Sequence, residues 1–381
     1  MSLLSLPNEL ISRIITYLDS PSPFDATLLH KPIGWRNLKQ PWQVDDPDEA
    51  PDGTLLWQDP LKQLSLTCRL VRSLAMPTLF KYAVLRPSHL TEFLAFLTSQ
   101  DLNQHVSSLV ADVPGMCRSL HPAWWARLLN EVPATRFSLF GPPEVLAQIT
   151  GIEALTADAW AFDMACQILQ FEQYPDDARV KINYDDLPNI LVARRWRHLT
   201  FNEGSSLLAY TTYEFFLRRT PSLLTALHFA NSAEADMLFD NLLSFEYIAI
   251  FPFYNHVAEI LMCIRKMLKL KRLMIKLCPE PGTTVLQDEI EQAGGHLDIN
   301  DPWNECETSW MLIAHSVVFL TVQGSLAELQ MDDVKVEAVR HTLETGLNAR
   351  LQAWWTYQGE GSGLWQRKCR SPHALVEPQE P

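Results

Sequence analysis

The side chains that could perform chemistry are dispersed along this sequence of 381 residues. Adjacent carboxylates occur, among other places, at 176–177, 185–186 and 332–333. Neighbouring side chains point to opposite faces of a strand and diverge by about 100° on a helix, so none of these pairs forms an acid–base dyad by itself. We expect the pairs in loops and at the starts of helices.

Histidine and cysteine show no spacing typical of a site. His228 and His315 lie inside apolar runs, which predicts histidines of the core rather than metal ligands. The seven cysteines form no C-x-x-C pair, and Cys306 has no metal-binding partner near it in the sequence. A dispersed, odd number of cysteines in a long chain indicates reduced thiols inside the cell. We therefore expect neither a metal nor another cofactor.

Motifs of the common enzyme classes are missing from the sequence, which contains no Walker A loop, no G-x-S-x-G elbow and no H-E-x-x-H helix. Gly359, Gly361 and Gly363 spell G-x-G-x-G, but no predicted strand precedes them as a dinucleotide site requires. The sequence therefore predicts a protein that is not an enzyme.

Composition and charge narrow the class of partner. Apolar residues make up 47% of the chain and charged residues 20%, which is typical of a globular protein. The net charge of −14 repels phosphate backbones, so we expect no nucleic-acid partner. The longest apolar run, 310–322, is too short to span a bilayer, and no signal peptide begins the chain. We expect a protein of the cytoplasm or the nucleus.

The elements that must position a binding surface begin at the N-terminus. Apolar residues recur every four positions from Leu6 to Leu18, with Pro7 in the first turn, which predicts a short amphipathic helix. A second helical segment starts at Asp59-Pro60 and ends near Pro77. Residues 19–58 between them are rich in proline and acidic residues, which indicates an inserted surface loop.

Together these segments resemble an F-box. The pattern reads Leu-Pro-x-Glu-Leu-x-x-x-Ile-x-x-x-Leu, then Leu-x-x-Leu-x-x-x-Cys-Arg-x-x-x-Ser-Leu-Ala and finally Leu-Phe, within residues 4–80. The family joins its first two helices by a short turn, whereas 19–58 intervene here. The resemblance implies binding to the Skp-type adaptor of a cullin–RING ubiquitin ligase through Leu6, Pro7, Leu10, Ile14, Leu18, Leu64, Cys68, Leu74 and Leu79. The alternative is a helical cap on the chain's own core.

Short strand-like runs alternate with helical stretches over residues 81–330. We predict strands at 81–85, 107–111, 136–140, 153–156, 197–201, 224–229, 246–250, 270–277 and 316–322. We predict helices at 121–132, 158–171, 205–219, 233–243 and 255–268. The spacing falls within the range of leucine-rich repeats, and the region resembles the irregular repeats that often follow an F-box. A doubly wound α/β domain is the rival fold.

The C-terminal part completes the predicted α/β architecture. A helix at 331–357 would cap the last strand of the solenoid, and 358–381 would form a flexible tail. In the tryptophan doublets at 124–125 and 354–355, one member of each could remain partly exposed. The sequence as a whole favours a substrate-recognition subunit of a Skp–cullin–F-box ubiquitin ligase that holds an unknown target on its repeat region. The alternatives are an interaction scaffold without the ligase and an unrecognised enzyme.

Overall fold

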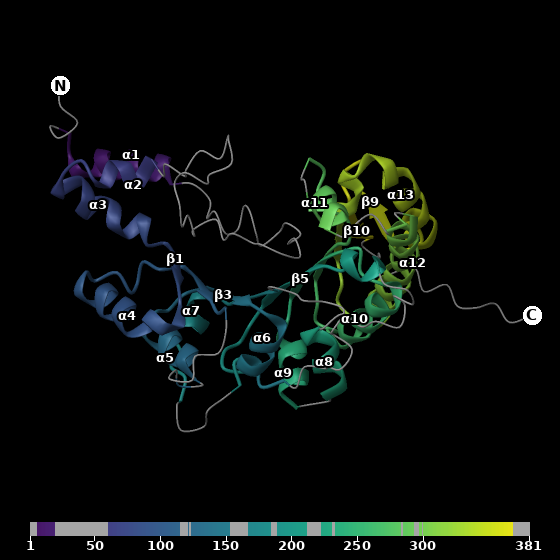
Figure 1. Ribbon diagram of the computed structural model, residues 1–381, viewed down its shortest axis with the longest axis horizontal. Coiled ribbons are helices and arrows are strands. Elements are labelled where there is room, and N and C mark those ends of the chain that lie inside the picture. Colours follow the sequence, from purple (N-terminus) through teal and green to yellow (C-terminus); the bar gives the residue numbers. More distant parts are fainter. Residues whose placement is uncertain are drawn as a thin grey trace, which may run out of the picture.

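Within the residues that the structure describes, a mixed α/β fold is built on one ten-stranded sheet (Figure 1). The computed structural model describes residues 6–19, 60–114, 121, 123–152, 167–183, 189–211, 222–230, 233–282, 285–292, 297–298 and 300–368. The strands are β1 Tyr82–Leu85, β2 Ser108–Asp112, β3 Arg136–Gly141, β4 Gln167–Glu172, β5 His198–Ser205, β6 Ser244–Ile250, β7 Arg272–Lys276, β8 Glu328–Met331, β9 Trp355–Tyr357 and β10 Leu364–Arg367.

The strands follow one another in space in their order along the chain, except that β10 lies between β8 and β9. Strands β1 to β3 are parallel, and so are β5 to β8. Strand β4 runs antiparallel to both of its neighbours, β3 and β5. Strand β10 is antiparallel to both β8 and β9. The order never reverses at a switch point, which contradicts the doubly wound alternative.

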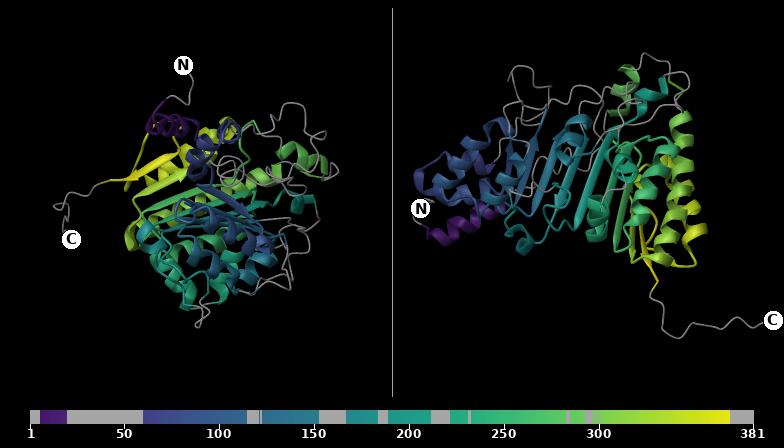
Figure 2. Two further views of the ribbon diagram at one scale, coloured as in Figure 1. Left: turned by 90° about the vertical axis from the view of Figure 1, so that its left-hand side faces the viewer. Right: turned by 90° about the horizontal axis from the view of Figure 1, so that it is seen from below.

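Helices cover one side of the sheet (Figure 2). The row contains α4 Leu90–Ser99, α5 Trp124–Glu131, α6 Pro143–Thr150, α8 Leu223–Ala230, α9 Ala233–Asn241, α10 Tyr254–Lys266, α12 Asn300–Gln323 and α13 Glu337–Leu351. Helix α12 packs between α10 and α13. One register row of the sheet, which includes Phe137, Phe171, Leu199, Phe245 and Leu273, is buried against these helices. A single apolar core therefore runs between sheet and helices.

Three further helices form a unit of their own beside β1 (Figure 1). They are α1 Asn8–Leu18, α2 Pro60–Ser65 and α3 Arg69–Leu79. Shorter elements are α7 Pro175–Ala178, α11 Val285–Gln292 and the 3-10 turns η4 Pro87–His89, η6 Leu207–Thr211 and η8 Asp332–Lys335. The pairs at 176–177 and 332–333 thus begin short helices, as expected, whereas 185–186 lie outside the described residues.

Most predicted strands are confirmed, but two are wrong. Residues 224–229 lie in α8, and 316–322 lie in α12, a helix of 24 residues. Buried apolar runs look alike in a strand and in a helix packed on several sides, so periodicity alone does not distinguish the two. The predicted helix at 158–171 is also wrong at its end, because 167–172 form β4. The predicted strand 153–156 lies outside the described residues.

The helices at 121–132, 233–243 and 255–268 are confirmed as α5, α9 and α10, while 205–219 contain only the turn η6 before the description stops. The predicted C-terminal helix is shorter than expected, because Met331 belongs to β8 and 355–357 form β9. The predicted tail returns into the sheet as β10. Both residues of the 124–125 doublet are buried, and His315 is exposed rather than in the core.

Candidate functional site

The two N-terminal segments meet in one small core. Ile11 and Ile15 of α1 pack against Leu61 of α2 and against Val71 and Ala75 of α3, and all five are buried. This cluster is separate from the core beneath the sheet. Cys68 precedes α3, and its Sγ accepts a hydrogen bond from the backbone N–H of Val71 at 3.5 Å. The unit therefore closes although residues 19–58 separate its halves.

The nine predicted adaptor-facing residues divide into two groups. Pro7 and Leu10 are exposed, and Ile14 is half-buried. The others are half-buried and pack against the core of the unit: Leu6, Leu18, Leu64, Cys68, Leu74 and Leu79. The second group therefore holds the three helices together, whereas Pro7 and Leu10 of the first group are exposed in the part of the chain that the structure describes.

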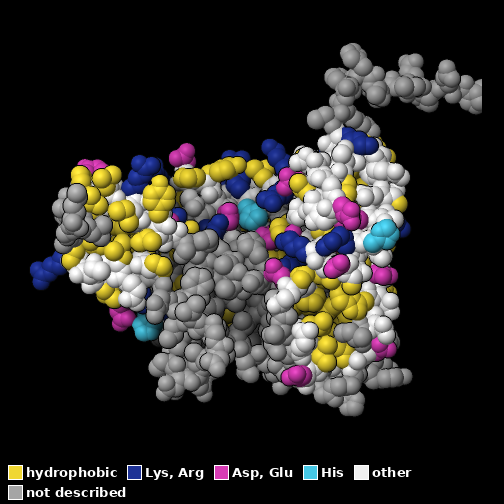
Figure 3. Space-filling model, turned by 90° about the horizontal axis from the view of Figure 1, so that it is seen from above, with side chains coloured by type: hydrophobic (Ala, Val, Ile, Leu, Met, Phe, Trp, Pro, Cys, Tyr) yellow, Lys and Arg dark blue, Asp and Glu magenta, His cyan; other side chains and the backbone are white. Residues whose placement is uncertain are grey.

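Exposed apolar side chains gather on the N-terminal unit, at the left of Figure 3. Pro7, Leu10, Ile14 and Tyr17 follow a spacing of three and four residues, which places them on one stripe of α1. Leu10 is 47% exposed and Leu66, between α2 and α3, is 65% exposed. Sequence reasoning missed Leu66 and Tyr17, because it sought the residues of the family pattern and these two lie outside it.

The unit is tied to the sheet at its last turn. Met76, in the last turn of α3, and Phe80, which directly follows the helix, pack against the main core. Lys81 Nζ donates a hydrogen bond to Asp19 Oδ2 at 2.8 Å, and this bond raises the pKa of Lys81. The chain then enters β1 directly.

A second surface is the face of the sheet opposite the helices, where polar side chains stand in register. One row contains Tyr82, Ser108, Arg136, Glu172, His198, Ser244, Arg272 and Glu328, one from each of β1 to β8. A second row lies two positions away along each strand, and its members Ser138, Gln170, Thr200 and Glu246 are buried. Since alternate residues share a face, both rows lie opposite the apolar core.

Hydrogen bonds join these rows across strands. Arg136 Nε donates to Glu172 Oε1 at 2.9 Å, and Gln170 Nε2 donates to the same oxygen at 3.0 Å. Thr200 Oγ1 donates to Glu246 Oε2 at 3.1 Å and lies 2.8 Å from His198 Nε2. Because the threonine proton is used, the imidazole must donate from Nε2. Burial lowers the pKa of His198, which favours the neutral imidazole with its proton on Nε2.

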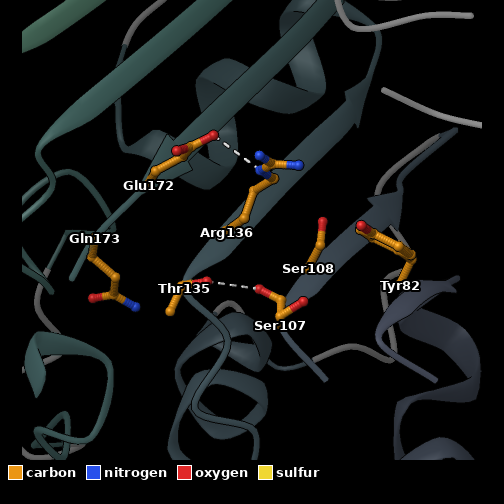
Figure 4. A pocket seen from close by; sticks show the side chains of 7 residues that line it. All are labelled: Tyr82, Ser107, Ser108, Thr135, Arg136, Glu172 and Gln173. Carbon is orange, nitrogen blue, oxygen red and sulfur yellow. Dashed lines mark hydrogen bonds and ion pairs between the residues drawn. The ribbon is translucent and has the colours of Figure 1, made fainter. Parts of the chain in front are cut away.

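A pocket of about 180 Å³ opens at one end of these rows (Figure 4). Its lining is polar and comprises Tyr82, Ser107, Ser108, Thr135, Arg136, Glu172 and Gln173. The Ser107 and Thr135 hydroxyls each donate to a backbone carbonyl at 3.1 Å, and Gln173 Nε2 donates to Ala134 O at 2.9 Å. The lining offers hydrogen bonds to a polar group, but it pairs no hydroxyl with a histidine base.

A polar cluster lies buried between the sheet and α10. Glu203 Oε2 accepts a hydrogen bond from Tyr247 OH and lies 2.7 Å from His256 Nε2. All three residues are at least nine-tenths buried, and burial raises the pKa of Tyr247 well above its usual value. A group so enclosed does not meet a substrate, and it links β5, β6 and α10 instead.

Within the described part of the chain, no three potential ligands are grouped for a metal, and no helix is long and apolar enough to cross a membrane. Comparisons with protein-family models, curated proteins and solved structures gave no match. The class that the molecule itself defines is an α/β protein with a sequential, mostly parallel sheet and a separate three-helix unit at its N-terminus.

Proposed function

We propose that this protein is the substrate-recognition subunit of a Skp–cullin–F-box ubiquitin ligase. The N-terminal unit docks on the Skp-type adaptor, and through it on the cullin, while the repeat region, an irregular leucine-rich-repeat-like solenoid, holds a target protein. The protein performs no chemistry of its own in this role. Other subunits transfer ubiquitin.

One observation carries the proposal. The two segments that resemble an F-box pack into one three-helix unit with its own core, despite the intervening residues 19–58. The sequential order of the strands further supports a solenoid, in which each unit contacts its neighbours.

The division of the apolar residues also supports docking. A unit that served only as a cap would bury its apolar side chains against the body, yet Pro7, Leu10, Tyr17 and Leu66 face solvent. Exposed apolar residues grouped on one small unit are typical of a protein–protein contact.

The test is co-purification of the full chain with a Skp-type adaptor. We expect Leu10→Asp to abolish co-purification, because truncating a central apolar anchor of an interface costs about 2 kcal/mol or more and a buried charge adds to that loss. Val180→Asp is the matched control, since Val180 is also exposed but lies far along the chain beyond α7. Equal adaptor recovery with wild type and Leu10→Asp, with circular dichroism unchanged, would reject the adaptor assignment.

A further inference from the structure

Basic residues gather at one edge of a chain whose net charge is −14. This basic edge consists of Lys266, Lys269, Lys271, Arg272, Arg367 and Lys368. Lys266 ends α10, Arg272 starts β7 and Arg367 ends β10. Lys269 and Lys271 lie between α10 and β7, and Lys368 follows β10. The run 265–272 alone holds five cations, although the chain has 31 lysines and arginines in 381 residues.

Backbone hydrogen bonds bring these residues together. Ala327 N donates to Lys271 O at 2.9 Å, and Arg367 N donates to Ala327 O at 2.9 Å. Lys271 and Arg367 therefore flank the start of β8, about two strand spacings apart, or roughly 10 Å. Lys271 and Arg367 are almost one hundred positions apart in the sequence, and the pairing of β7, β8 and β10 in the sheet brings them together.

The charges of the edge are only partly neutralised. Lys266 lies 3.6 Å from Asp236, and Arg272 lies 2.8 Å from Glu328. Lys368 Nζ and the Arg367 guanidinium donate to backbone carbonyls rather than to carboxylates. Lys269 and Lys271 are exposed and make no ion pair with any described residue. Among the described residues, the basic edge therefore carries an excess of positive charge.

Apolar side chains lie directly beside the edge. Ser325 N donates to Leu268 O at 2.9 Å, which holds Leu268 against the end of α12. Phe319 and Val322 are one turn apart on that helix, and Val322 is 57% exposed. The Arg265 guanidinium lies 5.6 Å from the Phe319 ring centroid and donates to Ser316 Oγ at 3.0 Å, so α10 and α12 are fixed here.

We propose that the basic edge and its apolar neighbours Leu268, Phe319 and Val322 bind a short acidic segment of a partner protein that carries apolar side chains. The positive charge of the edge favours acidic residues in the partner, and the exposed apolar area favours apolar side chains beside them. Nucleic acid is disfavoured, because the chain as a whole repels phosphate and the edge adds apolar residues to few cations. This surface is remote from the N-terminal unit and does not depend on adaptor binding.

The test uses fluorescence anisotropy of the full chain with a labelled peptide of about 12 residues, built from glutamates with leucines at helical spacing. We expect saturable binding that weakens as salt rises from about 0.05 M to about 0.5 M, since exposed charges are screened over that range. The same peptide with Gln for Glu, and a second with Ser for Leu, should each bind more weakly.

The variant Lys269→Glu with Lys271→Glu should weaken binding about tenfold, because two attractions of exposed charges become two repulsions. Arg179→Glu with Lys181→Glu is the control, because these two exposed cations have the same spacing and lie away from the edge, and only Lys181 differs by donating a hydrogen bond to Asn130 O. Val322→Ser with Leu268→Ser tests the apolar part, and thermal melting verifies folding of every variant. Equal binding by the two charge-reversed variants would overturn the proposal, as would tighter binding of a labelled oligothymidine of equal charge.

Discussion

The core of the N-terminal unit gives the sharpest prediction, for the substitution Ile15→Ala. Ile15 is 1% exposed and packs in a cluster of five buried residues. Removing three buried carbons from such a site costs about 2–5 kcal/mol. A core this small rarely supplies more than about 3–5 kcal/mol in total. We therefore expect Ile15→Ala to unfold α1 to α3 and to leave the sheet folded.

Hydrogen–deuterium exchange with mass spectrometry measures this outcome by segment. Amides of 8–18 and 60–79 should lose protection, while those of β3, β5 and β6 keep theirs. Ile14→Ala is the matched control, because Ile14 is the adjacent residue but lies half-buried outside the cluster. It should cost less than about 1 kcal/mol of the stability of the unit.

The contrary result is equally clear. Met76 and Phe80 pack against the main core, so the unit could be a cap that folds together with the sheet. In that case Ile15→Ala would raise exchange in the unit and the sheet alike, and a single thermal transition would shift. That outcome would refute an autonomous unit and weaken the adaptor proposal with it.

Two further predictions concern the sheet. Burial lowers the folded-state pKa of His198 below its unfolded value, so its contribution to stability is present above about pH 6.5 and is lost as the pH falls. Urea denaturation should therefore show that the wild-type protein loses up to about 1.4 kcal/mol of unfolding free energy per pH unit between pH 7.5 and pH 5.5 because of His198. His198→Gln should lack this loss. An identical pH dependence in both proteins would show that His198 does not cause it. Gly363 has φ +63°, and a Cβ there would lie 2.3 Å from Met331 O, whereas at Gly361, with φ +73°, the nearest neighbour would be 4.0 Å away. Gly363→Ala should thus lower the melting temperature clearly more than Gly361→Ala, and equal shifts would show that backbone conformation alone matters.

Much of the fold could be predicted from local pattern. Strands β1, β2, β3, β5, β6 and β7 lie where short β-type runs occur, and α10 begins and ends within two residues of its predicted range. The spacing of strands and helices was compatible with a sequential strand order and with a doubly wound one, and the structure shows the sequential order, in which each unit buries its face against the next. Strand β4 and its direction could not be predicted, because the residues before it have the apolar spacing of a helix and the alternation of apolar and polar residues in the strand itself is short.

The surfaces were harder to predict than the elements. Apolar spacing predicted the helices of the N-terminal unit, but neither the spacing nor the family resemblance could separate Leu10, which faces solvent, from Leu64, which packs inside. The polar rows of the sheet were missed because their members are one per strand and become neighbours only through register. The run 359–363 was rejected as a dinucleotide loop for want of a preceding strand. Strand β9 does precede it, but Gly359, Gly361 and Gly363 form the turn to β10, with positive φ at all three.

The hairpin of β9 and β10 has a consequence for self-association. An open parallel sheet ends in strands whose free amide and carbonyl groups can recruit another chain. Among the strands that the structure describes, the outermost are β1, with four residues, and β9, with three. Strand β8, which would otherwise be the edge, is covered by β10 in the antiparallel direction. Within the described residues, the antiparallel pair β10 and β9 therefore covers the backbone groups of β8 and replaces that edge with a three-residue strand, and a strand so short disfavours pairing with another copy.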